Sequence, residues 1–174
     1  MPDFNIRNAY AEDLAQIVAI YNAAIPGRLA TGDLESVSVE SREPWFKAHR
    51  PEKYPLIVAE DEGGVELMGW ASLGAFYGRV AYRHTAEISV YIDASHMRKG
   101  VGNALIEELV HRCPKLDIKS LMAFIFGHNH PSKKLFENRG FALWGTLPKI
   151  ADLDGIERDL EIYGMRITEP VALY

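Results

Sequence analysis

Residues 119–126, KSLMAFIF, form a nearly continuous apolar run between two segments with helical patterning. A run of this length and composition is typical of a β-strand that is covered on both faces. Such a strand requires helices packed on a sheet, so the run favours an α/β architecture. The preceding helix carries Val101, Leu105 and Leu109 on one side and should end at Pro114. The following helix should span 129–140, with Pro131 early and Gly140 at its end.

The remaining segments also divide into helical and strand patterns. An amphipathic helix is expected at 12–25, and a short helix capped by Ser38 should carry Trp45 and Phe46. The three tryptophans, Trp45, Trp70 and Trp144, are expected in the core or at an interface. Strands are expected at 3–9, 54–61, 65–76, 81–93, 119–126, 141–150 and 156–167. The order predicts one mixed α/β domain over residues 1–174.

Composition excludes several classes of protein. The chain has 19 basic and 24 acidic residues and a net charge of −5, which argues against a general nucleic-acid binder. With Cys113 as its single cysteine, it can form neither an intrachain disulfide nor a thiolate metal cluster. We see no signal-peptide pattern at MPDFNIRNAY and no apolar run long enough to span a membrane. The expected location is therefore cytoplasmic, without membrane attachment.

A glycine-rich turn, MRKGVG at 97–102, leads directly into the central helix. Gly100 and Gly102 allow a ligand to approach the backbone, and the first N–H groups of a helix attract anions. Arg98 and Lys99 add positive charge at the rim. The segment lacks the Gly-Lys-Ser/Thr of a Walker loop, and Leu105 occupies the position of the third glycine in GxGxxG. From these residues alone, both a phosphate site and an ordinary loop with solvated cations remain open.

In combination, three motifs resemble the GCN5-related N-acetyltransferase (GNAT) family. The turn at 97–102 matches its Q/R-x-x-G-x-G/A motif except at Met97, which replaces the usual Gln or Arg. ISVYI at 88–92 matches the preceding strand, and N-x-P-S-x-x-L-F-x-x-x-G-F at 129–141 matches the second family signature. The resemblance implies the GNAT fold: an α/β (α+β) domain whose mixed, mostly antiparallel central sheet of about seven strands is flanked by about four helices.

Four further segments are similar to the phosphinothricin and methionine sulfone acetyltransferase branch: YNAAI, TAEISVYI, GHNHPSKKLFENRGF and GTLPKIADLDG. This resemblance implies acetyl-CoA as cosubstrate and no metal. The implied acceptor is a small-molecule amine, the α-amino group of an amino acid with a phosphinyl, sulfone or sulfoximine group. It also implies a homodimer with active sites near the subunit contact.

The resemblance assigns Glu87 as the general base that takes the proton of the acceptor ammonium. A solvated or ion-paired glutamate is the alternative for that position. Backbone N–H groups near Val90, in a strand that is bulged in the family, would polarise the thioester carbonyl. The residues expected to bind the coenzyme are Val90, Tyr91, Ile92, Arg98, Lys99, Gly100, Val101, Gly102, Asn103, Asn129 and Ser132.

For the acceptor, the branch uses the region that flanks the strand of Glu87. The expected substrate-binding residues are Phe76, Tyr77, Arg79, Tyr82, Arg83 and Thr85, with Arg28 and Thr31 as candidates from an early loop. Many family members carry a tyrosine, the general acid, where this chain has Phe136. A phenylalanine cannot protonate the departing thiolate, so Ser132, water or no acid at all would serve.

Two other functions stay open. One is acetyl transfer to a different amine, such as a polyamine, an aminoglycoside or a protein N-terminus. The other is a catalytically silent acyl-CoA-binding regulator. The presence of Glu87 argues against the silent regulator, whereas Phe136 is compatible with it.

Overall fold

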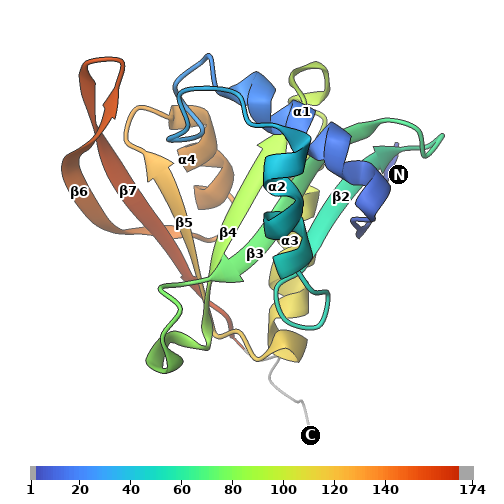
Figure 1. Ribbon diagram of the computed structural model, residues 1–174. Helices are drawn as coiled ribbons and strands as arrows, with labels where there is room; N and C mark the ends of the chain where they lie inside the picture. The colour runs from blue at the N-terminus through green and yellow to red at the C-terminus, as the bar shows by residue number, and fades with distance from the viewer. Residues whose placement is uncertain (1–2, 169–174) are drawn as a thin grey trace, which may run out of the picture.

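A computed structural model describes residues 3–168 as seven strands in one sheet with four helices (Figure 1). The spatial order is β1-β2-β3-β4-β5-β7-β6, and only β4 and β5 pair in parallel. This confirms the predicted mixed, mostly antiparallel sheet. The strands are β1 (Phe4–Asn8), β2 (Leu56–Asp61), β3 (Leu67–Ala75), β4 (Thr85–Ile92), β5 (Ser120–Phe126), β6 (Ala142–Leu153) and β7 (Ile156–Arg166), and the helices are α1 (Leu14–Ala24), α2 (Val39–Ala48), α3 (Val101–Arg112) and α4 (His130–Glu137).

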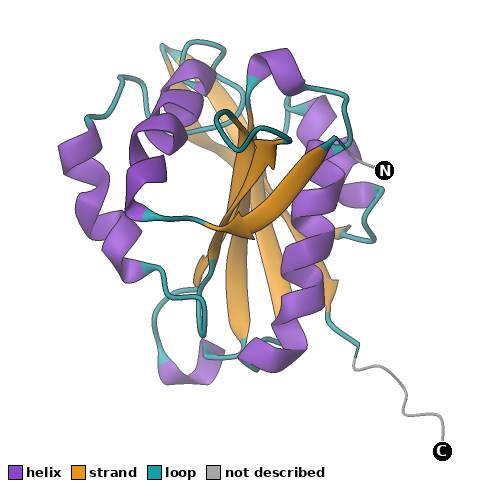
Figure 2. Ribbon diagram, turned by 90° about the vertical axis from the view of Figure 1, so that its right-hand side faces the viewer, coloured by secondary structure: helices purple, strands orange, loops and turns teal. Residues whose placement is uncertain are grey.

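Helices cover both faces of the sheet (Figures 1 and 2). On one face, Ile17 and Ile20 of α1 pack with Val58 and Trp70 of the sheet. On the other face, Leu105, Ile106 and Leu109 of α3 are fully buried in the larger core cluster, which also contains Phe136 of α4. Sheet and helices therefore form three layers, as burial of both sheet faces requires.

The apolar run of β5 is covered less completely than its sequence predicts. Leu121, Ala123 and Ile125 are buried in the larger core cluster, while Met122 and Phe124 on the opposite face remain half-buried. The reason is that β5 separates from β4 and lines a cleft there. The parallel pairing extends only from Thr85↔Ser120 to Glu87↔Met122, and the two strands then diverge (Figure 1).

The structure corrects three details of the sequence prediction. Residues 80–82 form a short 3-10 turn, so β4 begins at Thr85 rather than at residue 81. The β3–β4 pairing runs from Gly69↔Ile92 to Ala75↔Ala86 without a register shift, so the bulge expected near Val90 is not found against β3. Pro114 does not end the helical stretch abruptly, because it lies at the start of a 3-10 turn that continues α3, where its missing N–H costs nothing.

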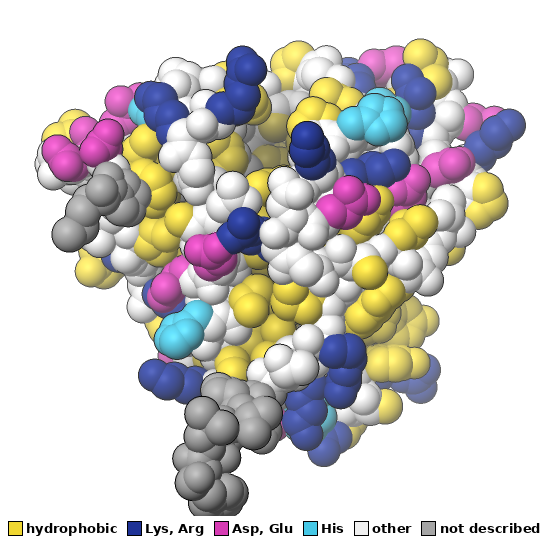
Figure 3. All heavy atoms as spheres, turned by 180° about the vertical axis from the view of Figure 1, so that it is seen from behind, with side chains coloured by type: hydrophobic (Ala, Val, Ile, Leu, Met, Phe, Trp, Pro, Cys, Tyr) yellow, Lys and Arg dark blue, Asp and Glu magenta, His cyan; other side chains and the backbone are white. Residues whose placement is uncertain are grey.

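Charged side chains of both signs are interspersed on the face seen in Figure 3. Lys and Arg form no continuous stripe on it, as the excess of acidic residues leads us to expect. Within residues 3–168, no helix is both long and apolar enough to cross a membrane.

Candidate active site

The divergence of β4 and β5 opens a cleft of about 380 Å³. One wall is β4 from Glu87 to Tyr91, and the other is β5 from Ala123 to Phe126. Asn129, Ser132 and Phe136 of α4 and its N-cap close the inner end, and the loop at 29–32 covers the opening. The broken ladder leaves backbone groups of two neighbouring strands facing the same space, where an extended ligand could pair with them.

Glu87 lies in this cleft at the last paired position of β4. Its side chain is half-buried, and within residues 3–168 its carboxylate has no hydrogen bond or ion pair. Burial alone raises the pKa of the Glu87 carboxyl above its ordinary value. The ion-paired alternative for this residue is thus wrong in the described structure. A carboxylate that is desolvated, unpaired and next to a cleft has the properties of a general base.

A second pocket, of about 390 Å³, surrounds the N-terminus of α3. Gly100 is the N-cap residue with φ +83°, a left-handed conformation in which glycine is strongly favoured, and no side chain caps the helix. The carbonyl of Gly100 accepts from the N–H of Ala104, so the N–H groups of residues 101–103 precede the helical ladder. Such groups, with the positive end of a twelve-residue helix, form an anion site.

Not every residue of the glycine-rich turn has the expected place. Arg98, Gly100, Val101, Gly102 and Asn103 line the α3 pocket, whereas Lys99 does not. The Oδ1 atom of Asn103 is buried and lacks a hydrogen-bond partner among the described residues, so a polar ligand would satisfy it.

Gly102 lines the α3 pocket and also packs closely against α4. A Cβ on this residue would lie 3.1 Å from Cδ2 of Leu135, a contact tight enough that the leucine side chain would have to shift. The two glycines therefore differ in role: Gly100 adopts the left-handed backbone conformation, and Gly102 allows close packing of Leu135, while ligand approach at Gly102 stays a prediction.

Asn129 caps α4 and also fastens the loop that covers the cleft. Its Oδ1 accepts from the N–H of Ser132 at 3.2 Å, and its Nδ2 donates to the carbonyl of Leu29 at 3.0 Å. The Tyr91 hydroxyl donates to the carbonyl of Ala30 at 3.0 Å. The predicted cap is confirmed, while binding of a coenzyme by Asn129 stays a prediction. The same contacts explain how the early loop, with Thr31, comes to line the cleft.

Of the residues predicted to bind the acceptor, Thr31 lines the cleft, whereas the six from the region 76–85 line neither the cleft nor the α3 pocket. Phe76, Tyr77 and Tyr82 form an aromatic cluster after β3, and the Phe76 ring stacks at 6.4 Å on Phe124, which does line the cleft. Arg79 and Arg83 are exposed. Thr85 opens β4, two residues before Glu87. Arg28 contacts Asp154 through an ion pair of 2.6 Å.

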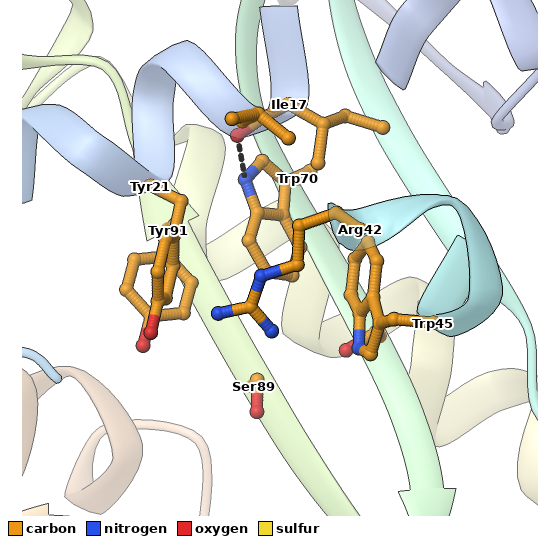
Figure 4. A pocket seen from close by; sticks show the side chains of 9 residues that line it. Ile17, Tyr21, Arg42, Trp45, Trp70, Ser89 and Tyr91 are labelled. Carbon is orange, nitrogen blue, oxygen red and sulfur yellow. Dashed lines mark hydrogen bonds between the residues drawn. The ribbon is translucent and has the colours of Figure 1, made fainter. Parts of the chain in front are cut away.

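A third pocket, of about 190 Å³, was missed in the sequence. It lies between the sheet and helices α1 and α2 (Figure 4). Ser89 and Tyr91 line both this pocket and the cleft of Glu87. Trp45 and Trp70, which the sequence assigns to the core or an interface, are packed together and also form pocket walls. The other lining residues are Ile17, Val18, Tyr21, Arg42 and Ser72.

One signal in the sequence could have indicated this pocket. Arg42 and Trp45 are three residues apart on a short helix, a spacing that places both on one face. In the structure both side chains are half-buried and line the pocket. Trp144 differs from the other two tryptophans: it is 47% exposed and covers Gly164 of the neighbouring strand.

Phe136 is buried at the inner end of the cleft, with its ring edge-on to Phe141 at 5.0 Å. It offers no proton donor there, whereas Ser132 lines both the cleft and the α3 pocket. In the described part of the chain, no three His, Cys, Asp or Glu side chains converge as a metal site.

Comparison with known proteins identifies the family of this chain. The model of the acetyltransferase (GNAT) family matches residues 15–141. A Bacillus subtilis protein, YwnH, which has a provisional name as a phosphinothricin acetyltransferase, is 51% identical over 94% of this chain and 99% of its own length. An L-methionine sulfoximine/L-methionine sulfone acetyltransferase of Pseudomonas paraeruginosa is 33% identical over 90% of each chain.

Solved structures agree with the family match. A phosphinothricin acetyltransferase of the GNAT superfamily from Sinorhizobium meliloti, solved in complex with acetyl-CoA, superimposes with a TM-score of 0.88. It is 32% identical, and the match covers 99% of this chain and 92% of that one.

Proposed function

Because this chain belongs to the GNAT acetyltransferase family, we propose that it transfers an acetyl group from acetyl-CoA to the α-amino group of a small amino acid. The observation that carries the proposal is the desolvated, unpaired carboxylate of Glu87 in the cleft between β4 and β5. The names of the relatives support acceptors of the phosphinothricin, methionine sulfone or methionine sulfoximine type.

The residues present fit the coenzyme. The α3 pocket would take the diphosphate, with backbone N–H groups of residues 101–103 as donors and Arg98 at the rim. The pantetheine arm would run from the α3 pocket into the cleft. The backbone of Val90 and Ile92, which β5 does not pair, offers amide partners, and Ser132 lines both pockets. This arrangement would bring the thioester end toward Glu87.

The chemistry requires a neutral amine. Glu87 would accept a proton from the acceptor ammonium, directly or through one water, and the amine nitrogen would then attack the thioester carbonyl carbon. The C–N bond forms and the attached nitrogen loses its second proton to water. The C–S bond breaks, and the departing thiolate takes a proton from Ser132 or from water, since Phe136 has none to give. Backbone N–H groups near Val90 would stabilise the oxyanion, and fixing both reactants in one cleft supplies much of the rate.

The proposal is tested by following thiol release from acetyl-CoA with a panel of amines. We expect turnover with L-methionine sulfone, L-methionine sulfoximine or phosphinothricin at kcat/KM at least about 100-fold above that with a polyamine, an aminoglycoside or a peptide N-terminus, because selective sites commonly discriminate by that factor. Turnover only with a polyamine, an aminoglycoside or a peptide N-terminus would reject the proposed acceptor class but would still support acetyl transfer. Binding of acetyl-CoA without turnover of any amine would support the silent regulator.

We also propose that the chain forms a homodimer. Support comes from exposed apolar side chains on the β6–β7 hairpin, which a partner subunit would bury: Leu143, Trp144, Ile150 and Ile156, all more than 45% exposed. Sedimentation equilibrium should give twice the monomer mass of 19.5 kDa. A single species at the monomer mass would contradict the dimer.

A further inference from the structure

We propose that the pocket between α2 and β4 binds an oxyanionic group of the acceptor, and that Arg42 is the residue that selects for it. The shared chemistry is an oxygen with a full negative charge (carboxylate or phosphinate) or a partial one (sulfone), which the acceptor would carry either at its α-carbon or at the end of its side chain. The inference rests on the proposed function, because it gives the acceptor of that reaction its binding site.

Arg42 has the donors for such a group. Its guanidinium reaches from α2 across the pocket toward Ser89 and Tyr91 of β4 (Figure 4). Nη2 donates to Asp33 at 2.9 Å, and no acceptor for its other N–H groups is found within residues 3–168. The side chain is 28% exposed, so these donors are partly desolvated. A planar guanidinium with free donors matches an oxyanion better than any other side chain does.

Asp33 and Tyr21 hold the guanidinium in place. Asp33 accepts from Arg42 and from the Tyr21 hydroxyl, and the Arg42 guanidinium carbon lies 4.9 Å from the centroid of the Tyr21 ring. An arginine fixed by an ion pair and an aromatic face keeps its remaining donors oriented before the ligand arrives, which lowers the entropic cost of binding.

The walls of the pocket fit a small amphipathic molecule. Trp70 stacks on Tyr91 at 4.8 Å, and Trp45 meets Trp70 edge-on at 5.5 Å. Ser72 and Ser89 place hydroxyls on the sheet side. An aromatic enclosure of about 190 Å³ with one cation and two serine hydroxyls suits a compact apolar group that ends in negatively charged or polarised oxygens.

The position relative to Glu87 connects this pocket to the reaction. Glu87, Ser89 and Tyr91 alternate onto the same face of β4, and residues two apart on a strand are about 7 Å from each other. Ser89 lines both the cleft and the Arg42 pocket. An amino acid with its amine at Glu87 could therefore reach Arg42 with either its carboxylate or its side-chain oxygens.

Fluorescence offers a test that does not depend on turnover. In a Trp144→Phe background, Trp45 and Trp70 are the two remaining tryptophans of the chain's three, and both line the pocket. The coenzyme A complex is titrated with phosphinothricin, L-methionine sulfone, norleucine (no side-chain oxygens) and 3-(methylsulfonyl)propylamine (no carboxylate). In Arg42→Gln, we expect the Kd for phosphinothricin to rise about 30- to 100-fold, the usual effect of losing charge-assisted hydrogen bonds.

Norleucine and 3-(methylsulfonyl)propylamine each lack one oxygen-bearing group, so they identify the group that Arg42 binds. If Arg42 binds the carboxylate, Arg42→Gln should change the Kd of 3-(methylsulfonyl)propylamine less than about threefold. If it binds the side-chain oxygens, norleucine should be the insensitive ligand. An equal loss for all four ligands, no loss, or no fluorescence response in the parent protein would overturn the inference.

Two controls on the same structure separate recognition from general damage. Lys47→Gln also removes one positive charge from α2, but Lys47 is exposed to solvent and pairs with Glu43. The Kd values of this variant should therefore match those of the parent protein. Asp33→Asn breaks the ion pair and leaves Arg42 in the pocket. The ligands with both oxygen-bearing groups should therefore still bind with a lower Kd than the ligand that lacks the group bound by Arg42. If the parent enzyme acetylates amino acids while Arg42→Gln weakens the binding of all four ligands equally, this inference fails and the proposed function stands. If no amino acid is acetylated, the proposed function fails.

Discussion

Replacing Glu87 with glutamine is expected to lower kcat/KM for the amine acceptor by about 100- to 10,000-fold, the range attributed to a positioned general base. Glutamine keeps the size of the side chain and removes only its ability to accept a proton. The KM for acetyl-CoA should change little, because the expected contacts of the coenzyme are made by backbone groups and by α3. Steady-state kinetics by thiol release measures both quantities.

The pH dependence distinguishes a base from a residue that merely shapes the cleft. Since burial raises the pKa of Glu87, kcat/KM should rise with pH as this carboxyl loses its proton, at a pH above the ordinary pKa of glutamate. In Glu87→Gln this limb of the profile should be absent. A variant that keeps the limb at reduced rate would show that another group is the base.

The same substitution should make the protein more stable at neutral pH. A carboxyl whose pKa is raised by folding contributes stability below its unfolded pKa, and this contribution is lost as the pH rises through the folded value. Glu87→Gln should therefore raise Tm at pH 7 and leave it nearly unchanged at pH 4. The exposed Glu62→Gln is the matched control and should shift Tm at neither pH. A lower Tm for Glu87→Gln at pH 7 would contradict the desolvation argument.

Gly100→Asp is expected to raise the KM for acetyl-CoA about 30- to 150-fold. An aspartate there would place a negative charge near the bound diphosphate, and the repulsion of two charges at ~6 Å in a partly screened site is about 2–3 kcal/mol. The carboxylate would also compete for the N–H groups of residues 101–103. Gly100→Asn is the matched control, since asparagine tolerates a positive φ and adds no charge.

The Asn variant should change KM less than about fivefold. With S-acetylpantetheine, which lacks the diphosphate, the Asp and Asn variants should give equal kcat/KM. A difference between Asp and Asn that persists with this substrate would show that the α3 pocket does not bind the diphosphate.

Most of the architecture could be predicted because it follows from periodic patterns. The apolar stripe of Val101, Leu105 and Leu109 and the order of the strands determine which faces are buried. The divergence of β4 and β5 could not be predicted from periodicity, since the residue pattern of neither strand changes where the pairing stops at Glu87. For the same reason the half-exposed face of Phe124 was predicted as covered.

The candidate site was predictable where a local motif defines it and unpredictable where distant segments meet. The turn at Gly100 and the cap at Asn129 are local, and both were identified by residue. The Arg42 pocket combines α1, α2, β3 and β4, and its residues share no motif. Phe76, Tyr77 and Tyr82 form an aromatic cluster outside the cleft, so their contact with the acceptor stays a prediction.

The most direct test of the account is a crystal structure of the protein with coenzyme A. We expect the diphosphate to lie on the N–H groups of residues 101–103 and the sulfur to lie in the cleft between β4 and β5, on the side that Glu87 faces. A diphosphate bound elsewhere, or a sulfur on the far side of β4 from Glu87, would contradict it.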